Sequence, residues 1–156
     1  DLSQYRTTDY IFSWDKMLSL HGNTAPYLQN AYVRIRSIFR RADVAAPLSR
    51  GDSRRQSAVA AKTDKLVFSD PAEIQLAKKL CQFAEVVPQV LNGFRPNILA
   101  TYLFELANSF HAFYEACPVL KSEKPLRSSR LALCDLTGRV LQRGLDLLGI
   151  KAPERM

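Results

Sequence analysis

The sequence predicts an all-α protein, a bundle of about five helices. Apolar residues recur three and four positions apart over most of the 156 residues. Residues that cap helices precede several of these stretches, and proline or glycine follows them. No stretch shows the alternating pattern of a half-buried strand.

The first predicted helices lie near the start of the sequence. A short helix is expected over residues 14–18, followed by a loop. Asn23 or Thr24 is expected to cap the next helix, because Pro26 suits a first helical turn, where its missing N–H would have no partner. That helix is predicted to extend to residue 41. Its apolar positions are Leu28, Ala31, Tyr32, Ile35, Ile38 and Phe39.

Residues 42–66 interrupt this pattern. Proline, glycine and several serines stand among scattered charges there, so a long mobile loop is expected. The next helix is predicted to begin with Asp70 as N-cap and Pro71 in the first position, with Glu73 placed to complete a capping box. Its apolar positions continue to Val87.

Two longer helices complete the prediction. One begins at Pro96 and ends before Pro118, because the residue before a proline disfavours the helical conformation. The last runs from about Leu126 to Leu148, with Gly149 as its C-terminal stop. All 156 residues are expected to form one domain. The core positions of the first of these helices are Leu99, Leu103, Leu106, Phe110, Phe113 and Cys117.

Composition narrows the class of protein. Hydrophobic residues make up 47% and charged residues 24% of the chain, as in globular proteins, so wholesale disorder is not expected. No apolar run approaches the ~20 residues that span a bilayer, and no secretory signal peptide is visible. Three widely spaced cysteines indicate reduced thiols and a cytoplasmic location. Because the sequence does not begin with methionine, we expect a piece of a longer protein.

The charge of the chain is positive and unevenly distributed. The net charge is +7, with 22 Lys and Arg against 15 Asp and Glu. Segments 1–41, 42–66, 67–117 and 118–156 carry net charges of +3, +2, −2 and +4. If the two ends share a surface, they form one basic face of the kind that binds a polyanion.

No pattern in the sequence indicates an active site. His21 and His111 have no cysteine, histidine or carboxylate at ligand spacing on their own elements, which argues against a metal site. Neither GxxxxGK[ST] nor GxGxxG occurs. The cysteines lie in or beside apolar helical stripes, where burial makes a thiol unreactive. We therefore expect no catalytic residue, metal or cofactor in this chain.

Two helices carry most of the arginines. The helix over residues 27–41 combines four arginines with three aromatic residues, a mixture that can bind phosphates and stack on unpaired bases. On this helix alone, a solvated basic face over a packed aromatic stripe is favoured. In the last helix, Arg139 and Arg143 have acidic neighbours and are expected to form ordinary surface pairs. Arg127 and Arg130 have none and are expected to point outward to a partner.

Residues 12–41 resemble the segment that follows the catalytic domain in arginyl-tRNA synthetases. The family pattern is roughly L-S-F-x-G-[DN]-T-[AG]-P-Y-L, and residues 18–28 read L-S-L-H-G-N-T-A-P-Y-L. The D-A-L-R motif of the family stands as N-G-F-R at residues 92–95, so only its arginine is kept. Residues 99–114 and the ending 148–156 are also similar to the family, so the natural C-terminus is expected to be present.

The resemblance implies the C-terminal anticodon-binding domain of a class I synthetase, a helix bundle in which residues 42–66 diverge. The parent enzyme would join arginine to its tRNA with ATP bound in a catalytic domain, whose nucleotide-binding motifs are absent here. This piece alone would then bind and orient tRNA without catalysing. The implied partners are the anticodon arm of an arginine tRNA and the catalytic domain of the same chain, with no membrane.

The resemblance also implies which residues meet the tRNA. Asn23 and Tyr27 would shape the loop before the basic helix over residues 27–41, and the four arginines of that helix would hold phosphates. Tyr114 and the two last residues would belong to a pocket for an anticodon base. The predicted tRNA-binding residues are Asn23, Tyr27, Arg34, Arg36, Arg40, Arg41, Tyr114, Arg127, Arg130, Arg155 and Met156.

Two other functions stay open at this point. The bundle could be a protein-docking module that holds only the catalytic domain, with incidental basic charge. A stand-alone helical enzyme would need a cleft of perturbed groups that the sequence does not show. Titration with an arginine tRNA and with an anticodon-mutated tRNA separates these functions from tRNA recognition.

Overall fold

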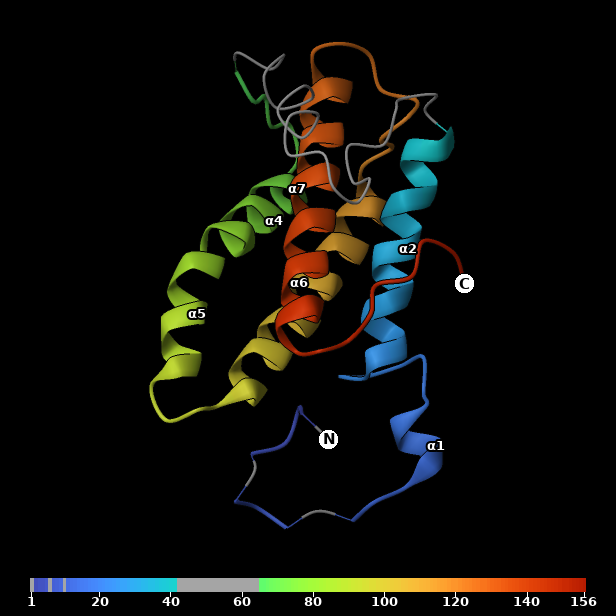
Figure 1. Cartoon of the computed structure of the whole chain (residues 1–156). Helices are drawn as coiled ribbons and strands as arrows, with labels where there is room; N and C mark the ends of the chain where they lie inside the picture. Colours follow the sequence, from blue (N-terminus) through green and yellow to red (C-terminus); the bar gives the residue numbers. More distant parts are fainter. Residues whose placement is uncertain (1, 6, 10, 42–64) are drawn as a thin grey trace.

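The computed structural model describes residues 2–5, 7–9, 11–41 and 65–156. This part of the chain contains helices and no strand, so the all-α prediction is confirmed. None of the described helices is both long and apolar enough to span a bilayer. The helices, coloured along the sequence in Figure 1, are α1 (Trp14–Met17), α2 (Ala25–Arg41), α4 (Pro71–Cys81), α5 (Phe83–Leu91), α6 (Pro96–Ala116) and α7 (Leu126–Leu147).

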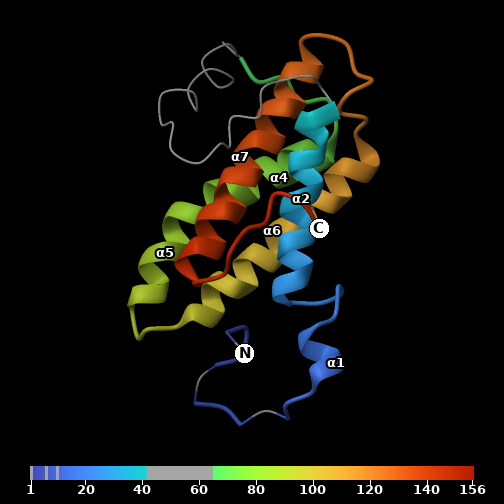
Figure 2. The ribbon, with the colours of Figure 1, turned by 45° about the vertical axis from the view of Figure 1, so that its right-hand side comes forward.

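Helix α6 lies at the centre of the bundle and contacts α2, α4, α5 and α7 (Figures 1 and 2). The predicted seam of α6 is buried throughout, from Leu99 to Cys117. The apolar positions predicted on α2 are buried as well, because α2 packs against both α6 and α7. The main apolar core therefore lies between these long helices, as their spacing predicted.

The predicted start of α4 is confirmed. The carboxylate of Asp70 accepts a hydrogen bond from Ala72 N at 2.8 Å, and Glu73 completes the capping box. The predicted continuation to Val87 is wrong, because α4 ends at Cys81 and α5 begins at Phe83. No proline or glycine marks this break in the sequence. The hydrogen bond from Gln82 N to the carbonyl of Lys79 tightens the last turn of α4 instead.

One thiol differs from the sequence prediction. Cys117 and Cys134 are buried as expected, but Cys81 is exposed at the end of α4. The buried positions of α4 are Glu73, Leu76 and Leu80, and Cys81 is the next residue after the last of them. The predicted loop over residues 42–66 lies outside the described residues, apart from Lys65 and Leu66, which are exposed.

Gly149 stops helix α7 as predicted, just after its last residue Leu147, and has a φ of 73°. Gly149 N donates to the carbonyl of Asp146 at 3.0 Å, and Ile150 N donates to the carbonyl of Leu145 at 2.9 Å. This pair of bonds is a Schellman motif, which requires the left-handed conformation that glycine adopts without strain. It turns residues 150–156, here called the C-terminal segment, back toward α2 (Figure 1).

Helices α6 and α7 approach closely at one glycine. A Cβ atom at Gly144 would lie 2.4 Å from Cδ2 of Leu103, well inside van der Waals contact. Leu103 is fully buried, so it has no open space into which to move. Glycine at position 144 therefore sets the distance between these two helices.

Candidate nucleic-acid interface

The structure brings two predicted tRNA-binding residues, Arg34 and Tyr114, together. Arg34 is exposed on α2, and its Cζ lies 5.9 Å from the centroid of the Tyr114 ring on α6. The Tyr114 ring stacks in turn on the buried ring of Phe110, with centroids 6.0 Å apart. A guanidinium beside a supported aromatic ring can contact a phosphate while the ring meets a base.

Tyr27 anchors the start of α2 to α6. Its hydroxyl donates to Asn108 Oδ1 at 2.5 Å and lies 3.0 Å from His111 Nδ1. Burial raises the pKa of Tyr27, an effect that the charge of Arg34 partly offsets. Burial also lowers the pKa of His111, so this histidine is favoured in its neutral form. Tyr27 thus holds the loop before α2 in place through side-chain contacts with α6.

The residue that caps α2 is Thr24, one of the two predicted candidates. Its hydroxyl accepts a hydrogen bond from Tyr27 N at 3.3 Å and donates to the carbonyl of Ser19 at 2.5 Å. Asn23 lies instead in the wall of a hollow of about 570 Å³, beside Leu2 and Leu148. The loop is therefore braced by Thr24, while Asn23 faces this hollow.

The C-terminal segment lies against the arginines of α2. Arg36 Nη2 is 3.5 Å from Glu154 Oε1, and Arg40 Nη1 donates to the carbonyl of Glu154 at 3.1 Å. Arg155 and Met156 follow at once and are exposed. Arg36 and Arg40 thus contact the C-terminal segment on one side of the buried stripe of α2, whereas Arg34 contacts Tyr114 on the other side.

Arg36 does not lie on an exposed face of α2. Its side chain is only 8% exposed, whereas Arg34, Arg40 and Arg41 are exposed. The helical spacing of Arg36 places it beside the apolar stripe, and the C-terminal segment covers that side. Sequence spacing on one helix could not show what a segment more than a hundred residues away would cover.

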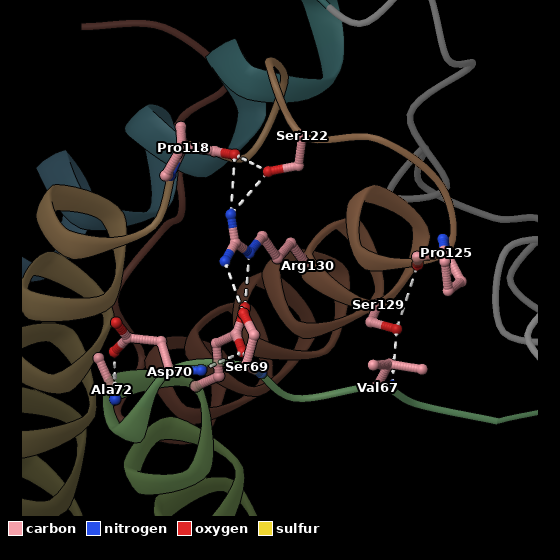
Figure 3. Close-up of polar contacts among 10 residues, drawn as sticks. Val67, Ser69, Asp70, Ala72, Pro118, Ser122, Pro125, Ser129 and Arg130 are labelled. Carbon is pink, nitrogen blue, oxygen red and sulfur yellow. Dashed lines mark hydrogen bonds and ion pairs between the residues drawn. The ribbon is translucent and has the colours of Figure 1, made fainter.

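The expectation that Arg130 points outward is wrong. Arg130 is 5% exposed, and its Nε lies 2.5 Å from Oε1 of Glu73, which is fully buried. Its Nη1 donates to the Pro118 carbonyl at 3.1 Å and to Ser122 Oγ at 2.6 Å (Figure 3). The partner of Arg130 comes from another helix, so a search for acidic residues at helical spacing on α7 alone missed it.

Both carboxylate oxygens of Glu73 have hydrogen-bond partners in the group of residues around Arg130. Its Oε2 accepts hydrogen bonds from Ser69 N at 2.6 Å and Asp70 N at 3.0 Å. Burial alone would raise the pKa of Glu73, but the hydrogen bonds from Arg130 and the two backbone amides outweigh it and lower the pKa. This cluster holds α4, α7 and the loop before α7 together. Arg127, three residues earlier in α7, is half-buried.

Asp135 is another charged residue whose burial the sequence did not reveal. It is 1% exposed, and its Oδ2 lies 3.2 Å from Arg139 Nε. Burial raises the pKa of Asp135, and the charges of Arg139 and Arg36 act in the opposite direction. The predicted pair of Asp135 and Arg139 therefore exists, but it is largely buried and lies within electrostatic reach of Arg36.

Comparison with known proteins supplies the family. Residues 28–156 match the model of the DALR anticodon binding domain. The chain belongs to this family. It is 53% identical to an arginine–tRNA ligase of Rippkaea orientalis and 49% identical to one of Photobacterium profundum. Each match covers 100% of the chain and 25% of the relative, so this DALR domain spans a quarter of the length of these curated relatives.

Solved structures agree with this assignment. An arginyl-tRNA synthetase of Plasmodium falciparum matches the DALR domain with a TM-score of 0.80 and 34% identity, over 100% of this chain and 25% of that one. The arginyl-tRNA synthetase of Thermus thermophilus matches with a TM-score of 0.70 and 37% identity, over 89% and 22%. The relationship that the sequence motifs indicated is confirmed.

Proposed function

We propose that this DALR domain binds the anticodon arm of an arginine tRNA and orients it for aminoacylation by a ligase of which it is part. The observation that carries this proposal is that α2, in a member of an anticodon-binding family, presents exposed arginines on two sides, with Arg34 beside Tyr114 and Arg40 beside the C-terminal segment. ATP and the aminoacylation chemistry would belong to the remainder of the ligase.

The two kinds of residue in this interface have different tasks. Exposed arginines such as Arg34 and Arg41 would contact phosphates, which set affinity and its dependence on salt but carry no sequence information. Tyr114 on one side of α2, and Arg155 and Met156 on the other, would contact unpaired bases, which carry the choice of tRNA. Arginine anticodons share C as their middle base, and we propose that this base is read.

We expect the chain to bind an arginine tRNA more tightly than the same tRNA with its middle anticodon base changed. Arg34→Ala should weaken binding of both tRNAs equally and reduce the salt slope by about one phosphate contact. Lys78→Ala removes the same charge from α4, on the other side of the bundle from α2 (Figure 1), and should change neither. The measurement is titration at several salt concentrations. Equal binding of the two tRNAs, or none, contradicts the proposal.

A different surface fits a protein partner. Residues 11–20 expose large apolar side chains, among them Ile11 at 90%, Trp14 at 69% and Leu18 at 65%. Exposed apolar clusters of this kind mark protein contacts, and such side chains do not bind phosphates. Because the relatives are four times as long as this chain, we propose that the remainder of the ligase covers these residues.

Trp14 reports on this contact, because it is the chain's only tryptophan. Its fluorescence in the isolated chain is expected at the long wavelengths of a hydrated indole and to be quenched readily by acrylamide. Addition of the remainder of the ligase should shift the emission to shorter wavelength and reduce the quenching. Unchanged emission upon verified complex formation would place the contact elsewhere.

A further inference from the structure

The C-terminal segment is attached to α2 by three side chains of that helix. Gln29 Nε2 donates to the carbonyl of Lys151 at 2.7 Å. Further along, Arg40 donates to the carbonyl of Glu154, and Arg36 pairs with the carboxylate of the same residue. Two of the three bonds go to main-chain carbonyls, so they fix the path of the backbone.

Arg36 differs from the other two in its surroundings. Its Nε and Nη1 atoms are buried and have no hydrogen-bond partner among the described residues, and the same holds for Oδ1 of Asp135. The charge of Arg36 acts on the buried carboxyl of Asp135. Arg36 therefore lies within electrostatic reach of a buried carboxyl group and pairs with the largely exposed carboxylate of Glu154.

This position does not suit a phosphate ligand. A phosphate would have to reach a side chain that is 8% exposed and already pairs with Glu154. Arg34 and Arg40, on the same helix, present their charges to solvent. A buried guanidinium whose one ion pair goes to the C-terminal segment is suited to hold that segment in place.

We propose that Arg36 is a positioning residue: it binds no RNA itself but seats the C-terminal segment on α2, and so places Arg155 and Met156 at the interface. The consequence for tRNA rests on the proposed function, whereas the seating of the segment does not.

The order parameters of the backbone amides of residues 150–156, measured by nuclear magnetic relaxation without RNA, test the seating directly, because they report the motion of the segment. Arg36→Gln should lower them at residues 154–156 to below about 0.6, the range of a flexible backbone. Glu154→Gln, at a side chain that is 67% exposed, should act in the same direction without disturbing the core. Arg34→Gln, on the same helix but away from the segment, should leave the order parameters unchanged. Order parameters unaffected by both Arg36→Gln and Glu154→Gln overturn the proposal.

The RNA experiment combines these variants with removal of residues 154–156. If Arg36 acts only through the segment, Arg36→Gln weakens tRNA binding in the full chain by about three- to tenfold. It then weakens binding no further in the shortened chain, whereas Arg34→Gln keeps its full effect in both. An equal effect of Arg36→Gln in both chains, with a reduced salt slope, would make Arg36 a phosphate ligand and overturn the proposal. If no chain binds tRNA, the proposed function fails, and the order parameters still decide the seating.

Discussion

Replacing Glu73 with glutamine is expected to lower the free energy of unfolding by about 3–5 kcal/mol. The change leaves the charge of Arg130 buried, where it is 5% exposed, without the carboxylate that balances it. A buried charge without its partner is costly because water cannot replace the lost interaction. Urea-induced unfolding followed by circular dichroism measures the loss.

The matched control is Glu105→Gln. Glu105 pairs with Lys79 between α6 and α4, but its side chain is 52% exposed, so its loss should cost less than about 1 kcal/mol. If Glu73→Gln unfolds the chain outright, the double variant Glu73→Met with Arg130→Met should restore part of the stability, because it removes both charges together. A cost at Glu73 no larger than at Glu105 would show that the buried pair is not important for stability.

The effect of Glu73→Gln should also depend on pH. The folded state lowers the pKa of Glu73, so the unfolded state binds the proton more tightly. The stability that the carboxylate contributes is fully present above its unfolded pKa and is lost as pH falls through the folded pKa. The difference between wild type and variant should therefore shrink in strongly acidic solution.

Replacing Gly144 with alanine is expected to destabilise the chain by about 1–3 kcal/mol. At an open helical position the same change stabilises by up to about 1 kcal/mol, because alanine is the better helix former. The expected sign is reversed here because the new Cβ would lie 2.4 Å from Leu103 Cδ2. Thermal and urea unfolding give the sign and the size.

A second substitution tests the cause. In a Leu103→Ala background the space beside position 144 is open, so Gly144→Ala should become neutral or stabilising there. Leu103→Ala alone is expected to cost about 2–5 kcal/mol through the cavity that it leaves. If Gly144→Ala costs the same in both backgrounds, contact between α6 and α7 is not the reason for glycine at this position.

Much of the fold could be predicted because its signals are local. The capping box at Asp70 and Glu73, the buried seam of α6 and the stop at Gly149 depend on residues a few positions apart. The break between α4 and α5 could not be predicted, since the apolar pattern runs through Gln82 without interruption. Its position depends on how both helices pack on α6.

In the candidate site too, features that depend on neighbouring residues could be predicted, and features that depend on distant residues could not. The motif over residues 18–28 indicates the family, and the structure places Arg34 beside Tyr114, two of the residues proposed for the interface. The burial of Arg130 and of Arg36 could not be predicted, because their partners Glu73 and Glu154 lie 57 and 118 residues away. A charged residue without an oppositely charged neighbour in sequence can bind RNA at the surface or form a buried ion pair. Only the tertiary contacts show which of these two roles it has.

The contact between α2 and the C-terminal segment has a consequence for how the protein is made. Gln29 and Lys151 lie 122 residues apart, so at about 5–20 residues per second the ribosome adds the second about 6–24 s after the first. For most of that interval the side of α2 that bears Gln29, Arg36 and Arg40 has been synthesised but lacks the C-terminal segment that covers it. Co-translational folding can therefore complete this side of the domain only after Lys151 has been synthesised, and any chain that terminates before Lys151 leaves it uncovered.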